Sequence, residues 1–137
     1  MGSTLFRFCF FFMLALLLCP IANAGDIVVI SNSEVTISAD EVEDIYTGEK
    51  QFSGSTLLIP IDNAALQEDF LSTLMKMDAA KYNRIWAKKL FRDGLQKPAM
   101  KSGEDEVAGF VRRTRGAIGY VSSIPPGVKV IQKIPVQ

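Results

Sequence analysis

The chain has 137 residues, with 15 basic and 15 acidic side chains, no histidine and two cysteines, and 48% of its residues are hydrophobic. This length accommodates one domain. The zero formal charge excludes nucleic-acid binding that is driven by bulk positive charge.

The first 24 residues have the pattern of a secretory signal peptide. Arg7 is followed by the uncharged apolar run 8–18, and Ala22 and Ala24 are the small residues that a signal peptidase requires. The apolar run is too short to span a bilayer as a permanent helix. We therefore expect cleavage after Ala24, export to the periplasm, and a mature domain of residues 25–137 that does not span the membrane.

Both cysteines, Cys9 and Cys19, lie in the segment that is expected to be removed. A lipid anchor at Cys19 is the alternative, but Leu18 occupies the position where lipoprotein processing requires a small residue. Without cysteine or histidine, the mature chain has no residues for zinc sites, Ser-His-Asp triads or haem ligation. Carboxylate and Ser-Lys mechanisms are not excluded by this composition, but we expect no metal, no cofactor and no enzymatic activity.

The first part of the mature chain alternates strand and helix signals. An apolar, β-branched run predicts a strand over 26–30. Ser38 and Glu41 have capping-box spacing and predict the start of a helix that ends at Gly48. A second apolar run predicts a strand over 56–61, with Pro60 at a sheet edge because proline has no amide hydrogen to donate.

Two helices are predicted next. Asp62 and Asn63 are expected to cap the first, whose apolar residues recur at helical spacing: Leu66, Phe70, Leu71, Leu74 and Met75. Asp78 is expected to cap the second, which ends at Gly94. Its inward side is predicted to be Tyr82, Ile85, Trp86 and Leu90.

The last third of the chain returns to strand. A polar loop over 96–103 leads to a helix that is capped by Ser102 and ends at Gly116. Strands are predicted over 117–121 and 128–134. This order predicts one three-layer α/β domain, with a largely parallel sheet of about four strands and helices on both faces.

Four segments resemble, in order, the phosphate-type periplasmic solute-binding proteins, in particular their short single-domain members. These are the helix over 35–48, the strand over 57–62 with the helix that follows it, the segment over 86–91, and the GAIGYV strand over 116–121. The resemblance covers nearly all of the mature chain. It implies the fold of one lobe of a type 2 periplasmic binding protein, and partners such as a small anion and a membrane transporter or sensor.

The matching stretch over 62–65 has no Arg, Ser, Thr or Gly, the residue types that the resemblance implies for an oxyanion cradle. Any anion site is expected at the carboxyl ends of parallel strands, where helix amino termini point their N–H groups outward. The candidate ligand residues are Ser31, Asn32, Ser33, Asn63, Ser102 and Gly103. Each is also a usual turn or cap residue.

Three arginines, Arg112, Arg113 and Arg115, cluster at the carboxyl end of the last predicted helix. They are either a solvated helix end that interacts with the helix dipole, or a docking patch for an acidic partner or an anionic membrane surface. Three functions follow as hypotheses. The first is a solute-binding-like periplasmic protein that recognises a small anion such as phosphate, or presents a binding lobe to a membrane partner such as a transporter or sensor. The second is a ligand-free interaction module. The third, an enzyme based on Asp26, Asp44 or Asp62, lacks any defined carboxylate pairing.

Overall fold

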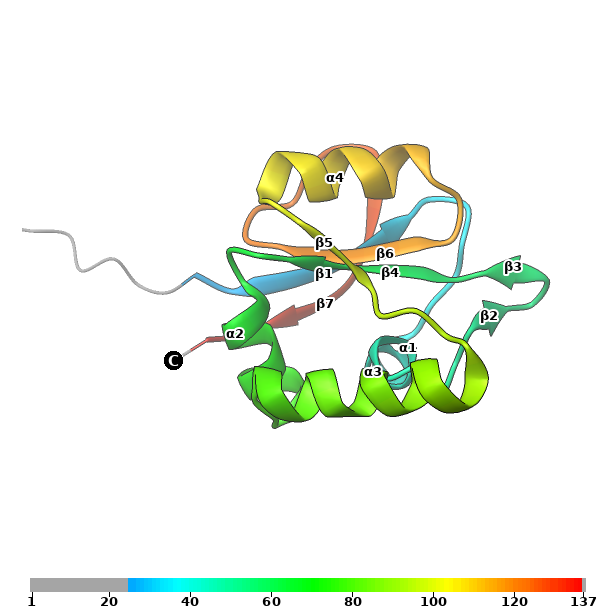
Figure 1. Ribbon diagram of the computed structural model, residues 1–137. Coiled ribbons are helices and arrows are strands. Elements are labelled where there is room, and N and C mark those ends of the chain that lie inside the picture. The colour runs from blue at the N-terminus through cyan, green and yellow to red at the C-terminus, as the bar shows by residue number, and fades with distance from the viewer. Residues whose placement is uncertain (1–24, 137) are drawn as a thin grey trace, which may run out of the picture.

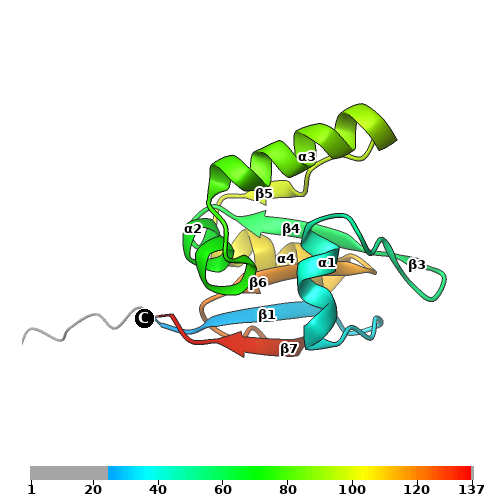
Figure 2. The same ribbon diagram turned by 90° about the horizontal axis from the view of Figure 1, so that it is seen from below.

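A five-stranded sheet lies between two helical layers in the computed structural model, which describes residues 25–136 (Figure 1). The predicted signal peptide lies outside the described residues. Helices α1 and α3 cover one face of the sheet and α4 covers the other (Figures 1 and 2). The strands are β1 (Ile27–Asn32), β2 (Phe52–Ser53), β3 (Thr56–Leu57), β4 (Ile59–Asn63), β5 (Ala99–Lys101), β6 (Ala117–Val121) and β7 (Val128–Ile134). The helices are η1 (Ala39–Glu41), α1 (Val42–Tyr46), α2 (Gln67–Phe70), η2 (Leu71–Met75), α3 (Ala79–Asp93) and α4 (Glu104–Arg113).

The strand order in the sheet is β5-β4-β6-β1-β7. Strand β4 pairs in parallel with β5 and β6, whereas β1 pairs antiparallel with both β6 and β7. Four of the five strands therefore run in one direction. The predicted three-layer α/β domain with a largely parallel sheet is confirmed.

The sheet has one strand more than the expected four. Strand β5 lies within the stretch that was predicted to be a polar loop, and it pairs with the end of β4 through Ile61 and Ala99. The predicted strand over 56–61 is divided at Leu58, so that Thr56 and Leu57 form a short hairpin with β2. Short edge strands give weak sequence signals because their pairing partners lie far away in the chain.

Two apolar clusters pack on opposite faces of the sheet. The larger lies under α1 and α3 and includes Tyr46, Phe70, Tyr82, Trp86 and Tyr120. The smaller lies under α4 and includes Ile30, Ile61, Val107 and Val111. A Cβ atom on Gly119 would lie 2.8 Å from Val107 Cγ1, so glycine allows α4 to approach β6 closely.

Several predicted helix ends are confirmed. Asp78 Oδ1 accepts a hydrogen bond from the amide of Lys81 at 2.8 Å and caps α3. Gly94 ends α3 in the left-handed conformation, with φ of 69°. Gly48, which follows α1, also has a positive φ of 80°. Trp86 is buried as predicted, but Leu90 is 55% exposed, so its predicted inward position is wrong.

Three predicted caps take other roles. Asp62 and Asn63 are the last residues of β4, and the following helix begins at Gln67 without a side-chain cap. Ser38 donates to the carboxylates of Asp40 and Glu41 and caps no backbone amide. Between residues 25 and 136, no helix is both long and apolar enough to cross a membrane.

Candidate functional site

The predicted ligand residues fall at two opposite ends of the sheet. Strand β4 runs parallel to β6, so Asn63 lies at the same end as Ser102 and Gly103, which follow β5. Strand β1 runs the other way, which places the residues at its carboxyl end, Ser31–Ser33, at the far end. The structure therefore does not bring these two groups into one site. Ser31 and Asn32 also belong to β1 rather than to the predicted turn.

Asn32 joins the far end of the sheet to α4. Its Nδ2 donates to the carbonyl oxygens of Val111 and Arg112, at 2.9 and 3.1 Å, and its Oδ1 accepts from the amide of Glu34. These bonds satisfy carbonyls at the carboxyl end of α4, which have no partner within the helix. Ser31 is fully buried beside it, and Ser33 is exposed. All polar atoms of the Asn32 amide thus have structural partners.

Asn63 has an equivalent role at the carboxyl ends of β4 and β6, which we call the carboxyl edge of the sheet. Its Nδ2 donates to the carbonyl of Tyr120 at 3.0 Å and to Glu104 Oε1 at 3.3 Å. Its Oδ1 accepts from the amide of Ala65 at 3.0 Å and fixes the turn after β4. Asn63 is fully buried, so its amide holds the ends of β4 and β6 together and is not exposed to a ligand.

The amino terminus of α4 meets the same edge. Gly103 is the residue before the helix, and the amide of Ser102 donates to Glu106 Oε2 at 3.0 Å. The Ser102 hydroxyl also donates to this carboxylate, and these bonds lower the pKa of Glu106 below its ordinary value. The predicted cap at Ser102 is therefore wrong: Gly103 takes the cap position, and the Ser102 side chain bonds to Glu106 in the first turn of the helix instead of to a backbone amide.

Glu104 is the residue at this edge that sequence reasoning missed. Its Oε1 and Oε2 accept from the backbone amide of Ser122 at 2.8 and 3.0 Å, and its Oε1 also accepts from Asn63. A carboxylate of the chain itself is thus held by a strand-end amide and a side-chain amide. The available signal was the run of three acidic residues in the first turn of α4, Glu104, Asp105 and Glu106.

Asp62 is next to the carboxyl edge in β4, but its side chain points into the core and not to the surface. The carboxylate is fully buried and accepts hydrogen bonds of 2.8 Å from the hydroxyls of Tyr82 and Tyr120. Burial raises the pKa of Asp62 above its ordinary value, while these hydroxyls and Lys97 oppose the shift. Burial also raises the pKa of both tyrosines, so their hydroxyls stay protonated as donors.

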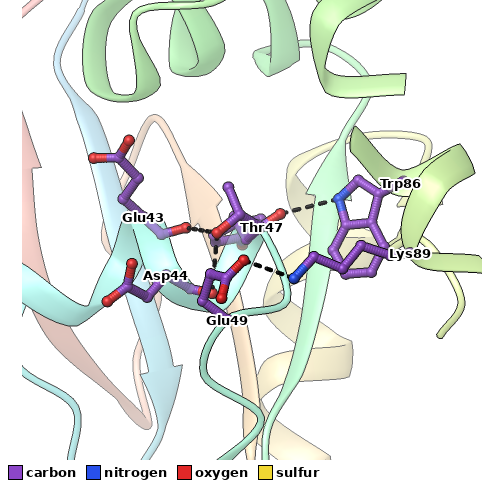
Figure 3. Close-up of polar contacts among 7 residues, drawn as sticks. Glu43, Asp44, Thr47, Glu49, Trp86 and Lys89 are labelled. Atoms are coloured by element: carbon purple, nitrogen blue, oxygen red, sulfur yellow. Dashed lines mark hydrogen bonds and ion pairs between the residues drawn. The ribbon is translucent and has the colours of Figure 1, made fainter. Parts of the chain in front are cut away.

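Polar contacts tie the end of α1 to α3 (Figure 3). The Trp86 indole donates to the carbonyl of Tyr46 at 3.0 Å. Lys89 donates to Glu49 Oε1 at 2.7 Å and lowers the pKa of Glu49. Within the end of α1 itself, the Thr47 hydroxyl donates to the carbonyl of Glu43 at 3.0 Å. These contacts hold the helical layer that covers the larger core.

The arginine cluster lies at the far end of the sheet. Arg112, Arg113 and Arg115 are all exposed, and Arg112 donates weakly to the carbonyl of Pro126 at 3.5 Å. Within residues 25–136 none of the three forms an ion pair. The same described part contains no group of three acidic, histidine or cysteine side chains that could hold a metal ion.

No protein-family model matches the chain, and no curated protein matches it in sequence. Its structure is similar to a protein described as a phosphate ABC transporter substrate-binding protein, solved with bound phosphate, from Clostridium perfringens. The TM-score is 0.61 and the identity is 15%, over 79% of this chain and 44% of that protein. An ABC-type phosphate transport receptor from Vibrio cholerae gives a TM-score of 0.49 at 15% identity, over 79% and 46% of the two chains.

The chain thus spans less than half the length of these solved structures. At this identity the likeness establishes the fold alone, which is a mixed α/β domain that resembles one lobe of a periplasmic binding protein. The phosphate bound in the Clostridium structure is a property of that protein.

Proposed function

We propose that this protein is a periplasmic, solute-binding-like protein that has kept the fold without a phosphate site. It acts as an interaction module for a membrane transporter or sensor. The single observation that carries this proposal is the position of Glu104, whose carboxylate accepts from the Ser122 amide at the carboxyl end of β6. Free amides at strand ends and helix starts are the groups that bind oxyanions in such folds.

The Glu104 carboxylate already accepts hydrogen bonds from these donors, so it acts as an internal anion. A phosphate at this edge would have to displace the carboxylate from the Ser122 amide and from Asn63. It would also approach the negative charges of Asp105 and Glu106 in the same helical turn. Both effects oppose binding, because like charges repel and the helix dipole already interacts with three carboxylates.

Helix α2 also begins near the carboxyl edge, and its first turn is negatively charged as well. Glu68 and Asp69 lie in the first turn of α2, and no cap side chain bonds its amides. A single lobe also leaves a bound ion open to water, where the high dielectric weakens each charge interaction. The charge at the carboxyl edge therefore supports the interaction module over the receptor for phosphate.

Calorimetric titration of the purified protein with inorganic phosphate at low ionic strength tests this proposal. We expect no saturable binding at micromolar phosphate. A dissociation constant near 1 μM, equivalent to about 8 kcal/mol of binding free energy, would instead establish a phosphate receptor.

Glu104→Gln removes the internal charge and keeps the shape of the side chain. We expect this variant to bind phosphate about ten-fold more tightly than the wild type. Glu68→Gln is the matched control, because it removes a charge from the neighbouring helix start, whose carboxylates do not accept from the Ser122 amide. Equal affinities of the two variants would contradict the role of Glu104.

The arginine cluster is the proposed docking surface for the membrane partner. A photo-crosslinking residue in place of Arg113, introduced in cells that express the protein, is expected to form an adduct with a membrane transporter or sensor. The same residue in place of exposed Lys133 on β7 is the control. Adducts of equal yield at both positions would contradict a specific surface.

A further inference from the structure

A cavity of about 300 Å³ opens at the β5 edge of the sheet, and Glu104 is not among the residues that line it. Two pairings of the segment over 58–61 frame it. On one side, the amide of Leu58 donates to the carbonyl of Gln51 at 2.9 Å, and on the other, Ile61 pairs with Ala99 of β5. Between them, Ile59 and Pro60 pair with β6 only. Proline has no amide hydrogen, so Pro60 leaves no unbonded donor at this opening.

The inner walls of the cavity are apolar. Ile45, Leu58, Ile61 and Trp86 line it and are each at most 5% exposed. The indole is fixed because its Nε1 donates to the carbonyl of Tyr46 (Figure 3). The pocket therefore has a preformed apolar interior, which is the usual character of a small-molecule site.

The polar lining of the cavity is positively charged. No acidic residue lines it, whereas Lys50, Lys97 and Lys101 do. Lys50 forms an ion pair with Glu41 at 3.1 Å.

The direct contacts of the other two lysines are with neutral side chains, although Lys97 acts at longer range on the Asp62 carboxylate and Lys101 on that of Glu106. Lys97 donates to Asn83 Oδ1 and lies 5.4 Å from the ring centroid of Tyr82. Lys101 lies 4.7 Å from the ring centroid of Phe110. Within residues 25–136 neither lysine has an ion-pair partner, so both charges are available to a ligand.

We propose that this cavity binds a small amphipathic organic anion, namely a monocarboxylate with an apolar body. The apolar body lies against Trp86 and Leu58, and the carboxylate meets Lys97 and Lys101. The volume of this cavity lies at the lower end of the range of small-molecule sites, about 300–1,000 Å³, so it suits a small ligand. Inorganic phosphate does not fit this chemistry, because apolar walls cannot replace its hydration.

The intrinsic fluorescence of the purified protein measures occupancy directly, because Trp86 is the only tryptophan of the chain and lines the cavity. The probe is octanoate, with acetate and octan-1-ol as matched compounds that lack the apolar body and the charge, respectively. We expect a saturable change of Trp86 emission with octanoate, at least five-fold weaker binding of octan-1-ol, and no saturation with acetate.

Two variants separate charge from volume. Lys97→Gln together with Lys101→Gln is expected to weaken octanoate about five-fold or more and to leave octan-1-ol unchanged. Ala99→Leu, which narrows the cavity from the exposed strand β5, is expected to weaken both probes. Lys133→Gln is the control, because β7 forms the opposite edge of the sheet.

Three outcomes would overturn the proposal. The first is the absence of a saturable octanoate response. The second is equal affinity for octanoate and octan-1-ol, since the lysines would then contribute nothing. The third is a Trp86 emission that changes with protein concentration alone, which would place a second copy of the chain in the cavity. None of these outcomes bears on the phosphate titration, so this proposal and the proposed function fail separately.

Discussion

The hydroxyl of Tyr82 on α3 donates to Oδ2 of Asp62 at the end of β4, at 2.8 Å, and both groups are fully buried. A second hydroxyl, from Tyr120 on β6, donates to the other carboxylate oxygen at the same distance. This arrangement joins two neighbouring strands and the helix above them through one carboxylate. Buried polar networks of this kind stabilise a structure only while each member keeps its partner.

Asp62 gives the stability of the protein a specific pH dependence. Burial raises its pKa in the folded state above the unfolded value, so the folded state binds the proton more tightly. The contribution of Asp62 is therefore fully present below the unfolded pKa, and it is lost as the pH rises through the folded pKa. We expect the free energy of unfolding of the wild type to fall relative to Asp62→Asn over this range, as measured by urea denaturation. A difference that is constant or grows with pH would contradict this prediction.

Trp86→Ala should lower the free energy of unfolding by about 3–5 kcal/mol, because it deletes a large side chain that is only 5% exposed. Phe91→Ala on the same helix is the control. That ring is 92% exposed, so its removal should change stability by less than about 0.5 kcal/mol. Chemical denaturation of the two variants measures both values. A loss under about 1 kcal/mol for Trp86→Ala would show that the ring does not act as a core residue.

Gly116→Ala should destabilise the fold by more than about 3 kcal/mol, through strain and a steric clash. The residue has a φ of 84°, and an added Cβ would collide with the carbonyl of Leu57. Gly94→Ala separates these two causes, because it has a φ of 69° but no atom within 4 Å of the added Cβ. It should cost only about 1 kcal/mol, which is the strain of the left-handed conformation. Equal thermal stability of the two variants would rule out the clash.

Asn32→Ala should lower the free energy of unfolding by about 1–3 kcal/mol, because it leaves buried carbonyls at the end of α4 without a donor. Ser33→Ala, at the exposed neighbouring position, should have almost no effect. Denaturation measures both variants, and calorimetry with phosphate checks for a ligand role. Reduced ligand binding at unchanged stability would show that Asn32 acts as a ligand residue and not as a helix cap.

Much of the fold could be predicted from local patterns. The strands β6 and β7 have the predicted bounds, and α3 begins after Asp78 and ends at Gly94 as expected. Each of these signals depends on neighbours within one element: alternating apolar residues, an acidic cap, or a glycine that adopts positive φ. The α/β class followed from the order of such elements.

The candidate site could not be predicted to the same extent. Asp62 and Asn63 have the composition of a helix cap, yet they end a buried strand and bond to groups 41, 57 and 58 residues away in the chain. Strand β5 exists because it pairs with β4, and the antiparallel direction of β1 relative to β6 decides that Ser31–Ser33 lie far from Asn63. Strand direction and pairing are set by hydrogen bonds between segments distant in the sequence, which local propensity does not encode. Only the tertiary structure could therefore place the Glu104 carboxylate on the amide of Ser122.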